Sequence, residues 1–137
     1  MQQQVLQKRV RTIPPTVRPE NVQNLRPALK RVAAYCRVST KQEEQLNSYE
    51  TQVNYYTDRI NREPGWKMAG IYADKGITGT SMKKRDEFNK LIRQCKRGRV
   101  DMIIVKSISR FARNTLDCIR ITRMLREIKV DVYFEEQ

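Results

Sequence analysis

Apolar and polar residues alternate along the chain in two different rhythms, one typical of strands and the other of helices. Four short apolar runs occur at RVAAYCRV (31–38), WKMAGIYA (66–73), DMIIVK (101–106) and VDVYF (130–134). Between these runs, apolar residues recur every three or four positions, which indicates one face of a helix. The helical stretches cover residues 44–62, 85–98 and 115–128. This alternation predicts an α/β fold with a mostly parallel central sheet flanked by helices.

Each predicted helix has an apolar face that we expect to pack on the sheet. The three faces consist of Tyr49, Val53, Tyr56 and Ile60; of Phe88, Leu91, Ile92 and Cys95; and of Leu116, Ile119, Thr122, Leu125 and Ile128. Gly98 is expected to end the second helix. The segments between elements include a predicted loop, DKGITGTSMKKR (74–85), and a predicted connection, SISRFARN (107–114).

Residues 1–30 differ from the rest of the chain. They contain four of the five prolines and show no periodicity, so we expect a flexible basic arm. Residues 31–137 then form one domain. No apolar run approaches the roughly 18 residues that a membrane-spanning helix needs, and the N-terminus lacks the apolar segment of a secretory signal. We therefore expect a cytoplasmic protein that does not bind a membrane.

Positive charge is concentrated in two places. The net charge is +13; residues 1–31 carry seven basic and one acidic side chain, and residues 82–113 carry 11 basic and three acidic ones. Such a surface favours a polyanion, and nucleic acid rather than a membrane, as the partner; a merely solvated basic surface is the alternative. Histidine is absent, which excludes Ser-His and Cys-His catalysis within this chain. Three scattered cysteines are too few for a disulfide framework.

Candidate chemistry collects at the ends of the predicted strands, where parallel α/β sheets bind their ligands. The residues there are Arg37 and Ser39 after the first strand, Asp74 after the second, and Ser107, Ser109, Arg110 and Arg113 after the third. Arg110 and Arg113 are three positions apart, so one helical turn would present them together. A serine hydroxyl among arginines fits attack on a phosphodiester, although a serine after a strand is also typical of a helix cap.

Two potential nucleophiles, Cys36 and Ser39, lie in or beside the first strand. Side chains alternate between the two faces of a strand. One face would carry Ala34, Cys36 and Val38, and the other would carry Tyr35, Arg37 and Ser39. The first set is small and apolar and the second is polar, which favours Ser39 as the nucleophile and Cys36 as a core residue.

Four motifs, taken in order, resemble those of a known enzyme family. They are YCRVST (35–40), SYETQ (48–52), YADKGITGT (72–80) with Arg85, and SRFARN (109–114). Residues 31–137 resemble the catalytic domain of the serine recombinases, which include resolvases and invertases, and DKGITGT looks most like the large integrases and transposases. The resemblance implies a resolvase-like fold and site-specific DNA recombination that needs no metal ion or nucleotide cofactor.

The resemblance also implies roles for individual residues. Ser39 matches the nucleophile, which forms a 5′-phosphoserine linkage and frees a 3′-hydroxyl group. The residues that match arginines of the site are Arg37, Arg110 and Arg113 around the scissile phosphate, with Arg85 as a further arginine. The residues that match polar groups shaping or supporting the site are Tyr35, Gln52 and Asp74. The implied partners are double-stranded DNA recombination sites and further copies of the chain, since these enzymes act as homodimers that assemble into a synaptic tetramer.

Two features depart from the family pattern. Ser109 stands where the family often has an acidic residue, which leaves Asp74 or the arginine network as candidates for protonating the leaving 3′-oxygen. The chain ends at VYFEEQ, so we expect a catalytic core truncated before the long C-terminal helix and the DNA-binding region of the family.

Two other functions are compatible with the sequence. A non-catalytic basic module would bind DNA through the arm and residues 82–113. A metal-dependent nuclease would use Asp74, Glu87 and Asp101, although these carboxylates do not cluster in the sequence.

Overall fold

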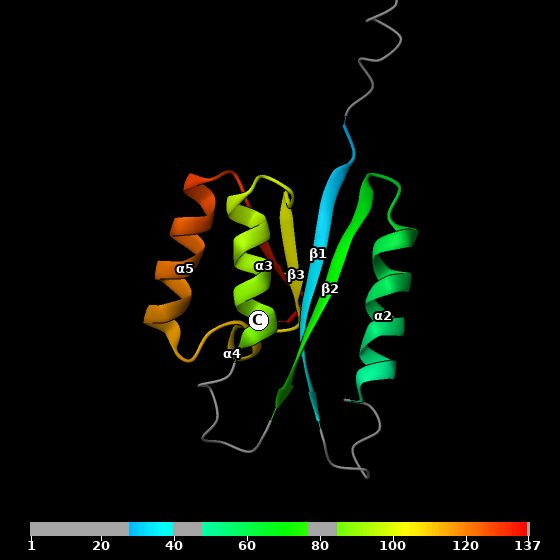
Figure 1. Ribbon diagram of the computed structural model, residues 1–137, viewed down its shortest axis with the longest axis horizontal. Helices are drawn as coiled ribbons and strands as arrows, with labels where there is room; N and C mark the ends of the chain where they lie inside the picture. Colours follow the sequence, from blue (N-terminus) through cyan, green and yellow to red (C-terminus); the bar gives the residue numbers. More distant parts are fainter. Residues whose placement is uncertain (1–27, 40–47, 77–84, 137) are drawn as a thin grey trace, which may run out of the picture.

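A parallel sheet with helices on both faces forms the domain (Figure 1). The computed structural model describes residues 28–39, 48–76 and 85–136. The strands in these ranges are β1 (Lys30–Ser39), β2 (Trp66–Gly76), β3 (Met102–Val105) and β4 (Asp131–Phe134). The helices are α2 (Tyr49–Arg62), α3 (Asp86–Lys96), α4 (Ile108–Phe111) and α5 (Thr115–Glu127). Every strand pair is parallel, so the predicted α/β class is confirmed.

The order of the strands creates a crevice at one end of the sheet. The order is β2-β1-β3-β4. From β1 the chain passes through α2 to β2 on one side, and from β3 it passes through α4 and α5 to β4 on the other side. Figure 1 shows α2 on one face of the sheet, and α3 and α5 on the opposite face. A reversal of this kind leaves room for a ligand beyond the carboxyl ends of β1 and β3.

Two clusters of buried side chains fill the two sides of the sheet. Tyr35 of β1 belongs to the cluster under α3 and α5, whereas Cys36 belongs to the cluster under α2. The ring of Phe88 packs edge to face against those of Tyr35 and Phe111, with centroids 5.1 and 5.5 Å apart. Burial on both faces explains why β3 reads MIIV without a polar residue.

Local hydrogen bonds set the ends of the helices. The Ser48 hydroxyl accepts from the Thr51 amide at 3.2 Å and caps α2, which begins at Tyr49. The predicted start at residue 44 lies outside the described residues. Asn114 caps α5 in the same way, through the Asp117 amide at 2.8 Å. Gly98 follows α3 as predicted, with φ +74°, a left-handed conformation that glycine adopts without strain.

The apolar face predicted for α5 is wrong in part. Leu125 is fully buried, but Leu116 is 72% exposed and Ile119 is 42% exposed. A second series of apolar residues with helical spacing, which includes Cys118 and Leu125, packs on the sheet instead. The helix thus contains two overlapping series of apolar residues with helical spacing, and both include Leu125. Periodicity alone does not show which of the two series faces the sheet.

The first helix shows a similar difference at its start. Tyr49, predicted to face the core, is 63% exposed, whereas Tyr56 and Ile60 are buried as predicted. The apolar face predicted for α3 is confirmed, with Phe88 and Leu91 among its buried residues.

The predicted arm falls almost entirely outside the described part of the chain. Only residues 28–30 of it are described, and Lys30 already belongs to β1. Among the helices of residues 48–62 and 85–127, none has the length and apolar character needed to cross a bilayer.

Truncation of Leu125 is expected to destabilise the domain far more than truncation of Leu116. Leu125→Ala leaves a cavity under α5 and should lower the free energy of unfolding by about 2–5 kcal/mol. Leu116→Ala removes the same atoms from an exposed position of the same helix and should change it by less than about 0.5 kcal/mol. Urea denaturation followed by circular dichroism measures both; equal losses would contradict the observed orientation of α5.

Candidate active site

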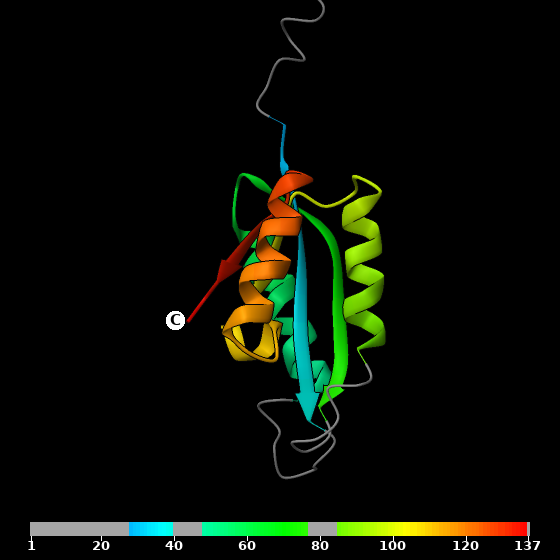
Figure 2. The same cartoon turned by 90° about the vertical axis from the view of Figure 1, so that its left-hand side faces the viewer.

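β1 and β2 continue past the carboxyl end of β3. Tyr35 pairs with Val105, the last residue of β3, whereas the pairing of β1 with β2 continues to Ser39 and Gly76. Figure 2 shows this end of β1 and β2 on the same side of the molecule as the short helix α4. Arg37 thus lies on the part of β1 that extends beyond β3. Ser39 is the last residue of β1, and its side chain is not among those that the structure describes.

A small cavity lies in the crevice between β1 and β3. Its lining consists of Tyr35, Cys36, Arg37, Gln52, Tyr56, Lys106 and Arg110. Four of the predicted site residues, Tyr35, Arg37, Gln52 and Arg110, therefore meet here, from β1, α2 and α4. The cavity has a volume of about 10 Å³, which is room for about one water molecule. A phosphate group would bind at its mouth and not inside it.

Lys106 lines this cavity and was missed by the sequence analysis. It follows β3 directly, its side chain is exposed, and its carbonyl accepts from the Glu136 amide at 2.7 Å. The signal was its position, since the first residue after an apolar parallel strand lies at the edge where ligands bind. With Arg37 and Arg110, it makes three cations around one cavity, an arrangement that attracts a phosphate group.

A larger cleft adjoins the small cavity and shares Gln52, Tyr56 and Lys106 with it. Its volume is about 510 Å³. On its wall, the hydroxyls of Tyr55 and Tyr56 donate to the two oxygens of Glu135, at 2.6 and 2.8 Å. Because Glu135 follows β4 directly, these bonds fasten the end of β4 to α2.

Asp74 lies in β2 and not in the predicted loop, because the strand continues past it. Its carboxylate, 7% exposed, accepts from the Tyr35 hydroxyl at 2.8 Å and from the amides of Glu87 and Phe88 at 2.9 and 3.1 Å. These amides belong to the first turn of α3, whose own N-cap residue, Arg85, makes no side-chain capping bond. Asp74 thus caps α3 from a neighbouring strand, and its bonds favour a supporting role over proton transfer.

Arg85 connects the start of α3 to the end of α4. Its guanidinium group stacks over the ring of Phe88, 3.7 Å from the centroid, and lies 5.2 Å from that of Tyr35. One of its Nη atoms donates to the carbonyl of Phe111 at 2.6 Å. Phe111 directly follows Arg110, so Arg85 holds the segment that carries this arginine.

Tyr35 is a buried residue of the core cluster as well as a lining residue of the small cavity. Its side chain is 1% exposed because the aromatic side chains of the core cover it. Burial raises the pKa of its hydroxyl to about 12, with a further contribution from Asp74 that opposes the effect of Arg85. Tyr35 is therefore a neutral hydrogen-bond donor to Asp74.

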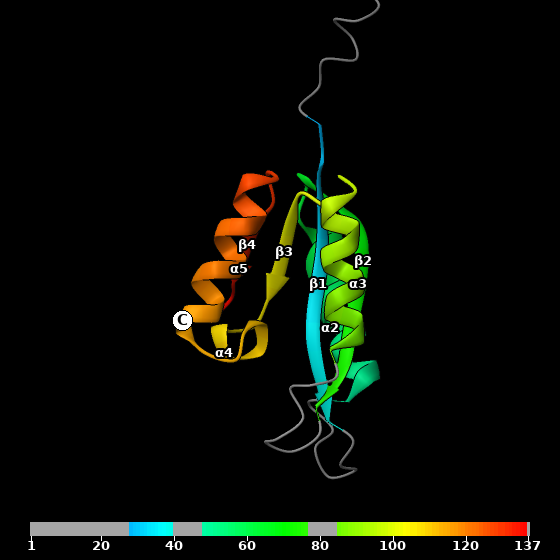
Figure 3. The same cartoon turned by 60° about the vertical axis from the view of Figure 1, so that its left-hand side comes forward.

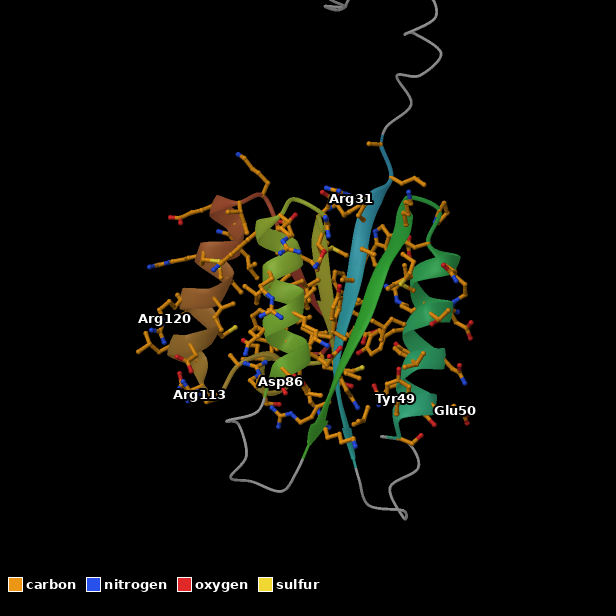
Figure 4. The ribbon with its side chains drawn as sticks, in the orientation of Figure 1. Arg31, Tyr49, Glu50, Asp86, Arg113 and Arg120 are labelled. Carbon is orange, nitrogen blue, oxygen red and sulfur yellow. The ribbon has the colours of Figure 1, made fainter. Side chains whose placement is uncertain are left out.

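Arg110 and Arg113 do not lie on one helical turn, contrary to the prediction. α4 ends one residue after Arg110, and Ala112 has an extended backbone with φ −140° and ψ 160°. Arg113 instead donates from Nε to Asp117 at 3.1 Å, and the same carboxylate pairs with Arg120. Hydrogen bonds from Arg120 and Arg113 lower the pKa of Asp117 despite burial. Figure 4 shows Arg113 and Arg120 on the outer side of α5, and Arg113 does not line the small cavity.

The three carboxylates of the nuclease hypothesis do not form one cluster. Asp101 precedes β3 and forms an ion pair with Arg31 at 3.0 Å, at the end of β1 opposite the crevice (Figure 4). Asp74 lies near the carboxyl end of β2. Within residues 28–39, 48–76 and 85–136, no group of three or more histidine, cysteine or acidic side chains could hold a metal ion. The described geometry does not support this alternative.

Comparisons with known proteins point to one family. The model of the family described as "Resolvase, N terminal domain" matches residues 32–137. A search of curated protein sequences finds no match. The N-terminal catalytic domain of TP901-1 integrase is 26% identical, with a TM-score of 0.65 over 77% of this chain and 78% of that chain.

Two further solved structures are similar. A resolvase family site-specific recombinase from Streptococcus pneumoniae is 28% identical, with a TM-score of 0.62 over 77% of this chain and 71% of that chain. The C-terminal catalytic domain of ISC1926 TnpA, an IS607-like serine recombinase, is 20% identical, with a TM-score of 0.63 over 78% and 69% of the two chains. At 20% identity, the similarity to ISC1926 TnpA concerns the fold alone.

Asp74→Asn is expected to lower the free energy of unfolding by about 1–3 kcal/mol, because an amide NH₂ group would replace an acceptor that faces buried donors. Asp58→Asn makes the same chemical change at an exposed position of α2 and should have almost no effect. Urea denaturation at pH 7 compares the two variants. An Asp74→Asn protein as stable as the wild type would show that Asp74 does not brace α3.

Cys36 is expected to react slowly with iodoacetamide in the folded protein. Burial, with a contribution from Asp74, raises the pKa of its thiol to about 12, so the reactive thiolate is scarce at pH 8 and increases only as the pH approaches 12. Unfolding in guanidinium chloride should restore the rate of a free cysteine. Mass spectrometry of the labelled peptide measures both rates; fast labelling of the native protein at pH 8 would contradict the burial.

Proposed function

The chain belongs to the resolvase N-terminal domain family, and we propose that it is the catalytic domain of a serine recombinase. It cuts and rejoins double-stranded DNA at specific sites. Ser39 is the nucleophile, and no metal ion takes part.

One observation carries this proposal. Arg37, Lys106 and Arg110 line the same cavity at the carboxyl end of the sheet, with Gln52 beside them. Ser39 follows Arg37 by two residues and ends the same strand. A phosphodiester at the mouth of the cavity would be bound by cations on several sides, which is what a negatively charged transition state requires.

In the proposed reaction, the hydroxyl of Ser39 attacks the phosphorus atom of a DNA phosphodiester. The bond between Oγ and phosphorus forms and the bond between phosphorus and the 3′-oxygen breaks. The 5′ end of the DNA is then linked to Ser39, and the other strand end carries a free 3′-hydroxyl group. The covalent linkage keeps the energy of the phosphodiester, so a 3′-hydroxyl from a second site can rejoin the DNA by the reverse reaction.

The other site residues have supporting parts in the proposal. Gln52 orients the phosphate from α2. The hydrogen bonds of Tyr35 and Asp74 join β1, β2 and α3, and Arg85 holds the segment that carries Arg110. Arg113 contributes to the phosphate site only after it exchanges the carboxylate of Asp117 for a phosphate oxygen.

DNA and further copies of the chain are the proposed partners. The basic residues of the 85–113 segment supply contacts to the phosphate backbone on the side of the crevice. The protein is proposed to bind as a homodimer and to form a synaptic tetramer, so that the strands of two sites are cut together.

The central test is a covalent adduct between the protein and DNA. The full-length protein that contains this chain is incubated with sheared genomic DNA of its source in the presence of EDTA, and DNA linked to protein is recovered after denaturation and sequenced. We expect adducts at a defined sequence with EDTA present, and none with Ser39→Ala. A Cys36→Ser protein should form the adduct at a normal rate.

Each of the other outcomes has a specific meaning. DNA binding without an adduct would contradict the proposal and favour a non-catalytic basic module. Cleavage that EDTA abolishes would favour a metal-dependent nuclease. An adduct that survives in Ser39→Ala but is lost in Cys36→Ser would exchange the roles of the two residues.

A further inference from the structure

The proposed reaction leaves one proton unassigned. When the bond to the 3′-oxygen breaks, this oxygen becomes a strongly basic alkoxide unless a proton reaches it. The arginines of the site stay protonated and cannot supply it. Asp74 is occupied by three donors, and Ser109 is not an acid. We propose that Lys106 is the general acid that protonates the leaving 3′-oxygen, an inference that rests on the proposed function.

The other groups around the cavity are poorly suited to this step. The Tyr35 hydroxyl donates to Asp74 at 2.8 Å and the Tyr56 hydroxyl donates to Glu135 at 2.8 Å, so both protons are already in use. Burial raises the pKa of Cys36 to about 12 and that of Tyr56 still further. Gln52 has no proton that it can transfer at neutral pH. Lys106 is the exposed group among the lining residues that can both lose a proton and regain it from water.

The position of Lys106 fits the step. Its backbone is fixed at the end of β3, because its carbonyl accepts from the Glu136 amide at 2.7 Å, and Lys106 lines both the cavity and the adjoining cleft. No ion pair occupies its ammonium group among the residues that the structure describes. A phosphate at the mouth of the cavity would therefore meet an ammonium group beside the guanidinium groups of Arg37 and Arg110.

Several charged or titratable groups surround Lys106. They are Arg37 from β1, Tyr55 and Tyr56 from α2, Arg110 from α4, and Glu135 and Glu136 after β4. The ammonium group of Lys106 thus lies between cationic side chains on one side and carboxylates on the other. Glu135 is already bound to two tyrosine hydroxyls, which leaves Glu136 as the freer of the two carboxylates.

Two protons move during cleavage. The Ser39 hydroxyl loses its proton to water as its oxygen bonds to phosphorus. The 3′-oxygen leaves with the electron pair of the broken bond and takes a proton from the Lys106 ammonium group, which becomes a neutral amine. In rejoining, the amine takes the proton of the attacking 3′-hydroxyl, and the serine oxygen is reprotonated from water.

A substrate with a better leaving group tests this role. The probe is a duplex with the sequence recovered in the adduct experiment, made with either a normal 3′-oxygen or a bridging 3′-sulfur at the scissile phosphate. A thiolate leaves without protonation. Lys106→Met should slow adduct formation by about 100-fold or more on the oxygen substrate, and should come within about tenfold of the wild type on the sulfur substrate.

Matched variants separate proton transfer from charge. Lys106→Arg keeps the positive charge but cannot give up a proton, so it should also be slow on oxygen and restored by sulfur. Arg110→Ala should be slow on both substrates, since its loss affects the phosphate itself. Lys67→Met removes an exposed lysine near the start of β2, at the end of the sheet opposite the crevice, and should react like the wild type on both substrates.

The outcomes distinguish this inference from the proposed function. Full activity of Lys106→Met, or an equal loss on the oxygen and sulfur substrates, would overturn the role of Lys106 while the adduct with Ser39 stands. Full activity of Lys106→Arg on the oxygen substrate would also overturn it, because charge alone would then suffice. A wild-type protein that forms no adduct with either substrate would refute the proposed function instead.

Discussion

The hydrogen bonds of the buried Asp74 carboxylate are the interactions on which the crevice end of the sheet depends. A charged group in such a place persists only when its oxygens are bonded, and removal of its partners typically costs several kcal/mol. Here the partners are a side chain of β1 and two amides of α3. Through α3 the constraint reaches Arg85, which stacks on Phe88 and binds the carbonyl of Phe111. The position of Arg110 relative to β1 thus depends on a carboxylate that need not touch the DNA.

The sequence predicts those features of the fold that depend on residues close together in the chain. Apolar periodicity marks β1, β3 and α3 almost to the residue, because each element buries a face with the spacing of its own backbone. The small polar side chains before α2 and α5 also act locally, as caps. The errors in the helix faces, at Tyr49, Leu116 and Ile119, concern apolar side chains that remain exposed. Local spacing does not show how far the neighbouring sheet extends beneath a helix.

The rest depends on contacts between distant parts of the chain. Figure 3 shows β3 between β1 and β4, an order that brings Lys106 to the cavity beside Arg37 although 69 positions of sequence separate them. No periodicity encodes that order. The capping of α3 by Asp74 spans 13 and 14 positions of sequence, whereas a helix start in the sequence normally suggests a cap from the preceding residue. The spacing of Arg110 and Arg113 predicts a single turn of helix, but the extended backbone of Ala112 interrupts that turn.

Asp117 is bound by two arginines, Arg113 and Arg120, so neither is its sole cationic partner. A buried carboxylate with a single cationic partner strongly resists the loss of that partner. Asp117 retains Arg120 when Arg113 departs, so the departure leaves the carboxylate neutralised. The Arg113 side chain is 62% exposed, and little packing holds it in place. Loss of the bond to Arg113 would therefore cost less than the loss of a sole cationic partner.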